Sequence, residues 1–558
     1  MTNMKNILMI ILSMVCMWAT AQTTTDVPSK LITNSNGACQ LIVNDKPFIM
    51  IGGELHNSTC STVDYMSQQW PKIKSLNLNT VLAAVAWEQI EPHEGKFDFT
   101  LVDSMIAGAQ KYGMKLVILW FGSWKNGESS YAPIWVKHDT KRFVRVQNKE
   151  GKELETLSPF CENTRNADAK AFKMLMAHIR QVDVQQGTVI AVQPENEVGI
   201  FLDQDYSKLG QKAFKQQVPV ELLRYMKANE GTLHEGLRNH WTEAGNKNEG
   251  TWSEVFGDNI WAKSYCMAWQ YASYIEYVAF QGRKEYNLPM FCNCWLVQNN
   301  EQLPGDYPNG GPVDRVHDIW KAAAPSIDVL CPDIYLPDFK GIAAAYHRHD
   351  NPLLIPEATM NPGNAFYAFG EHHALCYSPF GIEDGVGNFV FAEAYKVLGN
   401  LMPVITKYQG DSRMIGILSD GKETERLVEM GDYQLRIELD KKPSASYGII
   451  IQTADNEFLV AGINFKVTVS STKRGKIGYI EQVWEGSYQD GKWIPLRLLN
   501  GDETYHNAVL LAKGRQNFTT EATNDYSAKH SNEIFVYSPE TYKSVWTPGI
   551  YRMTVYTR

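Results

Sequence analysis

Short apolar runs alternate with longer mixed stretches from about residue 39 to residue 403. The runs are rich in Val, Ile, Leu and Phe, whereas stretches such as 66–76 and 101–112 carry apolar residues at helical spacing. Runs that are apolar throughout, rather than every second residue, predict parallel strands buried on both faces. Such runs occur at 48–53, 80–85, 115–121, 188–193, 290–295, 327–333, 353–357 and 374–380.

Eight strands separated by helices predict a (β/α)8 barrel, the TIM-barrel architecture. The alternative is a doubly wound sheet, but no glycine-rich phosphate loop follows the first run, which argues against it. The long polar stretch 203–259 is expected to be an insertion on the catalytic face, continuing into the helix that leads to the fifth strand.

The pattern changes beyond residue 405. Residues 433–439 alternate between apolar and polar side chains, and turn signals such as Asp420-Gly421 and Pro548-Gly549 recur. This pattern predicts an antiparallel β-sandwich over residues 406–558. We expect this accessory domain to pack against the barrel rather than to bind carbohydrate independently.

The first residues resemble a targeting segment. Lys5 precedes an apolar stretch at 7–18, and Ala19-Thr20-Ala21 offers small residues for cleavage. The stretch is shorter than the roughly 20 residues that span a membrane, although an uncleaved anchor is the alternative. We therefore predict a signal peptide at 1–21, a barrel at 22–405, no membrane span in the mature chain, and a periplasmic or extracellular location.

Composition and charge narrow the range of possible binding partners. The chain has 558 residues, of which 44% are hydrophobic and 21% charged, as in folded globular proteins. The net charge of −9 and the lack of a long basic run argue against nucleic acid as a partner. Oligomeric state is left open, because no apolar heptad or interface patch can be read.

Cysteine usage gives no sign of a metal centre. Eight of the nine cysteines follow the predicted signal peptide, and most lie in apolar runs, where thiols behave as small hydrophobic groups. Cys292 and Cys294 are separated by one residue, unlike zinc ligands. Disulfide pairing is left open, and no metal or other cofactor is predicted.

Carboxylates stand where two of the predicted strands end. Glu195 and Glu197 follow the fourth run, and Glu357 ends the seventh. In a barrel the carboxyl ends of the strands face one cleft, so Glu197 and Glu357 are expected to converge. Two such carboxyls suit a retaining glycosidase, which needs a nucleophile and an acid/base about 5–5.5 Å apart. For either glutamate alone, a salt-bridged strand end is the plainer interpretation.

The surrounding motifs resemble glycoside hydrolase family 35, the β-galactosidases. Residues 193–199, Gln-Pro-Glu-Asn-Glu-Val-Gly, resemble its Gln-Val-Glu-Asn-Glu-Tyr-Gly signature. Residues 79–81 with Trp87 and 91–95 resemble its second strand, and residues 47–56 resemble its first. The resemblance covers about residues 40–400. The segment around Glu357, residues 377–383 and the β-rich tail look closest to a bacterial subgroup.

This resemblance implies a role for each matching residue. Glu197 would be the acid/base and Glu357 the nucleophile, with Asn196 binding the sugar 2-hydroxyl and Tyr335 orienting Glu357. Where the family has an Ala-Glu pair that contacts galactose, this chain has Lys125-Asn126. The family's Tyr after His is replaced as well, by Asn57. These departures bear on the sugar bound more than on the reaction.

Further sugar contacts are expected at the barrel mouth. Trp295 is a candidate stacking surface, with a core residue at the rim as the alternative. Glu54 and Asn57 are candidates for hydroxyl binding, with a polar strand cap as the alternative. Glu383 is a candidate ligand contact, with a barrel salt bridge as the alternative.

The expected protein is therefore an exported retaining exo-β-galactosidase acting on plant-type oligosaccharides or polysaccharides. Within enzymes, the alternative is another barrel glycosidase of the endo-galactanase or mannanase type. Outside enzymes, it is a carbohydrate-binding protein on the same fold. Linkage and aglycone are not predicted.

Overall fold

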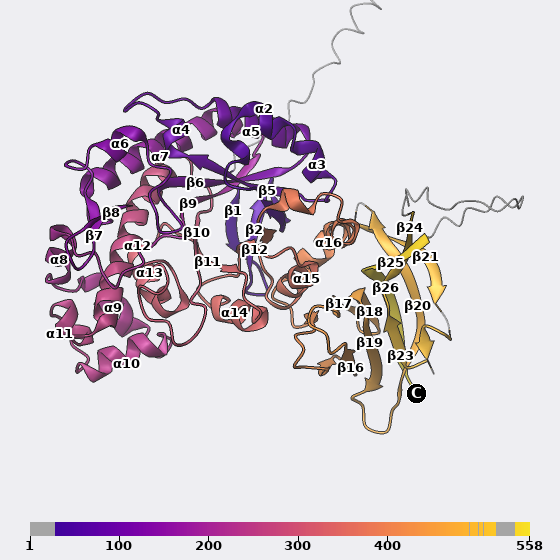
Figure 1. Ribbon diagram of the computed structural model, residues 1–558. Helices are drawn as coiled ribbons and strands as arrows, with labels where there is room; N and C mark the ends of the chain where they lie inside the picture. The colour runs from indigo at the N-terminus through magenta and orange to yellow at the C-terminus, as the bar shows by residue number, and fades with distance from the viewer. Residues whose placement is uncertain (1–27, 490, 500, 506, 521–541) are drawn as a thin grey trace, which may run out of the picture.

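The computed structural model describes residues 28–489, 491–499, 501–505, 507–520 and 542–558. The predicted signal peptide, residues 1–21, lies outside the described residues. Figure 1 shows a barrel wrapped by helices, followed by a β-rich domain at the C-terminal end.

Eight parallel strands form the barrel. They are paired in the order β10-β11-β12-β13-β4-β5-β6-β9, and a parallel bridge from Val192 to Met290 joins the two ends. The predicted (β/α)8 barrel is confirmed, and each predicted run overlaps one strand. The strands are β4 (Met50–Glu54), β5 (Thr80–Ala86), β6 (Lys115–Lys125), β9 (Val189–Asn196), β10 (Phe291–Cys294), β11 (Val329–Ile334), β12 (Ile355–Ala358) and β13 (Cys376–Pro379).

Burial on both faces explains why these strands are continuous apolar runs. Every residue of β5 and β9 is buried. One face meets the helices, and the other fills the barrel interior. An N-terminal sheet, β1 (Lys30–Thr33), β2 (Cys39–Val43) and β3 (Lys46–Phe48), contributes Leu41 and Val43 to the same interior cluster as Met50 and Val117. This sheet therefore packs at the end of the barrel where its strands begin.

Helices cover the outside of the barrel. The polar insertion forms four short helices before the long helix that leads to β10, as expected. The helices are α2 (Val63–Ser67), α3 (Trp70–Lys74), α4 (Trp87–Ile90), α5 (Thr100–Lys111), α6 (Ile134–His138), α7 (Glu162–Asp183), α8 (Lys208–Phe214), α9 (Val220–Ala228), α10 (Glu235–Glu243), α11 (Trp252–Phe256), α12 (Ile260–Glu285), α13 (His317–Ala323), α14 (Phe339–Tyr346), α15 (Pro362–Glu371) and α16 (Phe389–Tyr408). A two-stranded sheet, β7 (Arg145–Gln147) and β8 (Glu153–Leu157), lies between α6 and α7.

The C-terminal part is the predicted antiparallel sandwich. One sheet has the order β14-β17-β18-β26-β20-β21 and the other β15-β16-β19-β23-β22, with a separate β24-β25 pair. Alternate residues such as Leu435, Val467 and Val460 fill the core between the sheets. The strands are β14 (Met414–Leu418), β15 (Glu425–Met430), β16 (Tyr433–Leu439), β17 (Tyr447–Ala454), β18 (Glu457–Ile463), β19 (Phe465–Ser471), β20 (Gly478–Gln489), β21 (Lys492–Leu499), β22 (Thr504–Tyr505), β23 (Val509–Ala512), β24 (Arg515–Thr520), β25 (Tyr542–Thr547) and β26 (Gly549–Thr557).

The sandwich packs against the barrel through α15 and α16 (Figure 1). Ile449 and Ile451 of β17 belong to the same buried cluster as Phe366 of α15. At the edge of this contact, the Arg426 guanidinium donates to both carboxylate oxygens of Glu371, at 2.9 and 3.1 Å. The expectation that the sandwich packs against the barrel is met.

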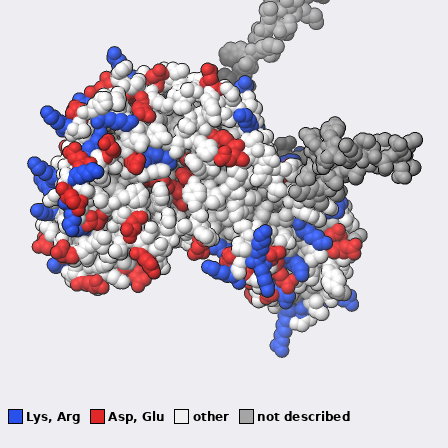
Figure 2. Space-filling view, viewed as in Figure 1, with Lys and Arg blue, Asp and Glu red and all other residues white. Residues whose placement is uncertain are grey.

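All eight cysteines of the described residues are free thiols, and seven of them are buried. Among the described residues, no helix is long and apolar enough to cross a membrane. Both signs of charge are interspersed over the face shown in Figure 2. The charges that bear on chemistry are instead buried in the barrel.

Candidate active site

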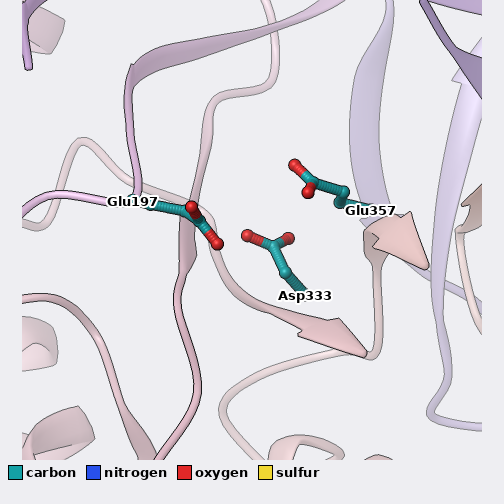
Figure 3. Close-up of side chains that lie close together, drawn as sticks. All are labelled: Glu197, Asp333 and Glu357. Atoms are coloured by element: carbon teal, nitrogen blue, oxygen red, sulfur yellow. The ribbon is translucent and has the colours of Figure 1, made fainter. Parts of the chain in front are cut away.

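Three carboxylates converge at the carboxyl ends of the barrel strands. Glu197 directly follows β9, Asp333 lies near the end of β11, and Glu357 lies in β12. One carboxylate oxygen of each lies within 4.8 Å of the others. Figure 3 shows the three carboxyl groups pointing toward one another from different strands. The sequence prediction that Glu197 and Glu357 meet at one cleft agrees with this geometry.

The acids open into a small cavity. Its volume is about 210 Å³, below the roughly 300–1,000 Å³ of pockets that hold drug-sized ligands. Such a space suits one sugar ring rather than a long chain. The lining residues are Asn126, Glu197, Trp295, Leu296, Gln298, Asp333, Tyr335, Leu336 and Glu357.

Backbone conformation separates the two glutamates after the fourth strand. Glu195 and Glu197 both have positive φ, at 62° and 41°. Glu197 enters the cavity, whereas the Glu195 carboxylate accepts hydrogen bonds from the backbone N–H groups of Ser123 and Trp124, at 3.1 and 2.7 Å. Burial and nearby Asp168 hold the pKa of Glu195 well above its usual range. Glu195 therefore links the end of β9 to the backbone of β6 and does not line the cavity.

Asn293 fixes two of the cavity acids. Its side-chain oxygen accepts the backbone N–H of Glu197 at 3.0 Å, and its side-chain nitrogen donates to the Asp333 carboxylate at 2.7 Å. Sequence reasoning did not select Asn293 or the Asp333 carboxyl as site residues. Their position at the ends of the fifth and sixth predicted strands was the available signal. Asn293, however, was considered only as a spacer between two cysteines.

Tyr335 holds Glu357. The Tyr335 hydroxyl donates to one oxygen of Glu357 at 2.5 Å, while the other oxygen is buried with no protein partner. Burial and the charge of Glu357 raise the pKa of Tyr335, so the hydroxyl keeps its proton. The free oxygen of Glu357 is thus available to a ligand in the cavity.

The cluster holds more carboxyls than it can ionise together. Burial, followed by the charge of Glu357, raises the pKa of Glu197 to about 7. The same two causes hold the pKa values of Asp333 and Glu54 well above their usual range. Neutral forms of Asp333 and Glu54 therefore persist at neutral pH, and Glu197 is poised to gain or lose a proton there.

Lys125 supplies positive charge beside the acids. Its ammonium lowers the pKa values of Glu54 and Glu197, opposing the larger effect of burial. The ammonium also donates to the side-chain oxygen of Asn196 at 2.9 Å. The Asn196 side-chain nitrogen has no protein partner and is buried. Asn196 is therefore oriented by Lys125 and retains a free donor for a ligand.

The other predicted contacts occupy different positions. Asn126 and Trp295 line the cavity. Glu54 is buried at the end of β4, and one oxygen each of Glu54 and Asn57 has no partner. Glu383 instead accepts the Thr59 hydroxyl at 2.6 Å and the backbone N–H of His56 at 3.2 Å. In these contacts Glu383 anchors the loop after β4.

The chemistry of the donor set favours proton transfer. Among the described residues, Glu197, Asp333 and Glu357 are the only group of three potential metal-ligating side chains this close together. Hard cations take six or more oxygen ligands in many protein sites, whereas Asp333 and Glu357 already accept hydrogen bonds from Asn293 and Tyr335. The expectation that no catalytic metal is used stays a prediction.

Comparison with known proteins finds a family model that matches part of the barrel. Residues 40–261 match Glycosyl hydrolases family 35. The family 35 match includes Lys125, Asn196 and Glu197 but ends before Asp333 and Glu357. Residues 391–510 match a domain of unknown function, DUF5597, which covers most of α16 and much of the sandwich.

Individual relatives match a limited part of the chain. The human protein Beta-galactosidase-1-like protein 3 is 32% identical over 183 residues, covering 32% of this chain and 26% of the relative. A Beta-galactosidase from Xanthomonas manihotis is 28% identical over 181 residues, covering 32% and 28%. The chain thus spans about a quarter of the length of these relatives.

Solved structures also resemble the chain in part. The beta-galactosidase of Bacillus circulans sp. alkalophilus matches with 16% identity and a TM-score of 0.44, over 65% of this chain and 59% of that one. The barrel assignment rests on the strand order of the chain itself.

Proposed function

We propose that this family 35 chain is a retaining exo-β-galactosidase that removes terminal β-galactosyl residues from plant-type oligosaccharides or polysaccharides. The observation that carries the proposal is the pairing of Glu197 and Glu357 within 4.8 Å at the ends of β9 and β12. Retaining enzymes hold their two carboxyls about 5–5.5 Å apart, whereas inverting enzymes leave about 6.5–9.5 Å for a water. The names of the relatives support galactose as the sugar.

In the first step a Glu357 oxygen attacks the anomeric carbon. The bond to the glycosidic oxygen breaks, and Glu197 gives its proton to that oxygen, so the leaving group departs as an alcohol. A neutral ester then joins Glu357 to the sugar. Because Glu357 no longer carries a charge, one of the causes that raises the pKa of Glu197 is removed.

In the second step Glu197, now ionised, takes a proton from water. The hydroxide equivalent attacks the anomeric carbon, the ester bond breaks, and Glu357 is released as a carboxylate. Asn196, held by Lys125, would donate its free amide proton to the sugar 2-hydroxyl. The one-sugar size of the cavity supports action at a chain end.

The test uses a panel of aryl β-glycosides with the mature chain and its Glu357→Gln and Glu197→Gln variants. We expect selective cleavage of the β-galactoside and a loss of turnover of roughly a thousand-fold or more in each variant, with unchanged thermal unfolding. Normal turnover in either variant would refute the roles of the two glutamates. Products longer than one sugar from oligosaccharides would favour an endo-acting enzyme, and binding without products a carbohydrate-binding protein.

Azide distinguishes the two glutamates. In a Glu197→Ala variant the sugar–enzyme ester still forms from an activated aryl galactoside. Azide, an anion that needs no base, then attacks the anomeric carbon in place of water and releases Glu357 as a carboxylate. We expect azide to restore turnover and give a β-galactosyl azide with Glu197→Ala, and to give no β product with Glu357→Ala.

We also propose that residues 1–21 direct export and that the mature enzyme acts in the periplasm or outside the cell. The support is the basic, apolar and small-residue order of that segment. Placement in a bacterial subgroup of the family rests on the same kind of sequence likeness. Mass spectrometry of the secreted chain would test export, since cleavage should leave Gln22 at the N-terminus.

A further inference from the structure

A partly exposed aromatic pair, Trp295 and Phe201, lies at the cavity that contains the acids. Trp295 lines the cavity. The Phe201 ring contacts the Trp295 ring edge-to-face, with ring centroids 5.9 Å apart and planes at 90°. The Phe201 side chain is 49% exposed. A phenylalanine this open, next to a second aromatic at a cavity mouth, leaves apolar surface for a ligand to cover.

The backbone holds Phe201 firmly in place. The preceding residue, Ile200, exchanges two backbone hydrogen bonds with Asn309, at 3.1 and 2.8 Å. Gly127 packs beneath the Phe201 ring, and a Cβ at that glycine would lie 3.5 Å from the ring. The backbone that carries Phe201 is therefore tied to the segment around Asn309, and the ring lies between Gly127 and Trp295.

Chain geometry puts this pair on the leaving-group side. Phe201 follows Glu197 by four residues in the segment that leaves β9. Glu197 protonates the departing oxygen in the proposed reaction, and its carboxyl approaches the cluster from the side opposite Glu357 (Figure 3). The group attached to that oxygen therefore emerges next to Glu197, where Phe201 and Trp295 lie.

We propose that Phe201 and Trp295 form the subsite for the leaving group, and that this group is a neutral sugar residue. The inference rests on the proposed function. Sugar rings present an apolar C–H face, which stacks on aromatic rings, and a hydroxyl edge, which needs polar partners. Gln298, an exposed amide that lines the cavity, supplies such a partner without charge.

The test compares substrates with and without a leaving-group sugar. Phe201→Ala should lower kcat/KM for a β-galactosyl disaccharide by about 3- to 10-fold, the loss expected for one aromatic contact. It should leave kcat/KM for β-galactosyl fluoride unchanged, because fluoride makes no contact with the subsite. Phe201→Tyr keeps a ring and should retain disaccharide activity.

A matched control is Phe280→Ala, which removes another open phenylalanine, 47% exposed on α12. It should change neither substrate, and thermal unfolding of each variant reports on folding. Equal losses on both substrates, or none on the disaccharide, would overturn the subsite while leaving the reaction intact. Failure of the unmodified chain to hydrolyse β-galactosyl fluoride would overturn the proposed function, and this inference with it.

Discussion

Asp333 shows how a third carboxyl can serve a two-carboxyl reaction. It is buried between Glu197 and Glu357, and Asn293 occupies one of its oxygens. Burial, and after it the charges of Glu357 and Glu197, hold the pKa of Asp333 well above its usual range, so Asp333 keeps its proton and can offer it to the ionised form of Glu197. The interaction with Asp333 lowers the pKa of Glu197 and so opposes the larger effect of burial, which raises it. Asp333 thus acts on the reaction through Glu197.

The pH dependence of kcat/KM should report this interaction. The first step needs Glu197 protonated, so kcat/KM should fall as the pH rises through about 7. Asp333→Val removes the donor and should move this alkaline limb upward by about one pH unit. Asp333→Asn keeps an N–H donor and should leave the limb near that of the unmodified chain. A downward shift in both variants would mean that Asp333 is ionised in the free enzyme.

Residue type together with position at the end of a predicted strand was enough to predict part of this carboxyl cluster. Glu197 and Glu357 were found because barrel strands present their carboxyl ends to one cleft. The roles of Asp333 and Asn293 depend on hydrogen bonds between strands that the sequence does not show. Glu195 has the same chemistry as Glu197, two residues away, yet the backbone turns it toward Ser123 and Trp124. Side-chain direction in a left-handed turn cannot be read from composition.

The junction of β6 and β9 positions the site. Their register shifts between Leu116 and Val117, is regular from Val117 to Trp120, and shifts again before Lys125 pairs with Asn196. Gly122 lies in this irregular stretch. A Cβ there would lie 2.4 Å from the Trp120 indole nitrogen and 2.6 Å from a Glu195 oxygen. The absence of a side chain at Gly122 therefore lets the Glu195 carboxylate fill the gap between the strands.

We expect Gly122→Ala to lower the free energy of unfolding by about 1–3 kcal/mol, because the added methyl group must displace buried polar partners. Activity should fall with it, since Lys125 and Asn196 move with the strands. Gly231→Ala is the control: no atom lies within 4 Å of its added Cβ. Urea unfolding of both variants makes the comparison. Equal stability would show that the junction has room to adjust.

The positions of the strands were easier to predict from the sequence than the pairing between strands. In the barrel, strands that are neighbours in sequence are neighbours in the sheet, so eight apolar runs were enough to predict the strand order. In the sandwich, β26 pairs with both β18 and β20, bringing the C-terminal strand into the middle of a sheet. Alternation in 433–439 shows that one face is buried but gives no partner, because many antiparallel orders bury the same face.

Barrel and sandwich share a buried core. Phe366 of α15, Tyr395 of α16 and Ile449 of β17 belong to one cluster. Because α15 follows β12, the strand that carries Glu357, the sandwich supports the layer behind the proposed nucleophile. Interfaces between loosely joined domains permit independent unfolding, whereas a continuous apolar core couples the two parts.

The whole chain should therefore unfold in one transition, in which far-UV circular dichroism and hydrolysis of β-galactosyl fluoride are lost together. Gly416→Leu tests the coupling, because a Cβ at Gly416 would lie 2.7 Å from the backbone nitrogen of Glu371 and the backbone oxygen of Tyr367. Both atoms belong to α15 and cannot rotate away, so docking of β14 should be disturbed, and Tm and activity should fall together. Lys466→Gln, at an exposed position on β19, should change neither. A sandwich transition well below the loss of activity would contradict the shared core, since the barrel would then hold Glu357 in place without it.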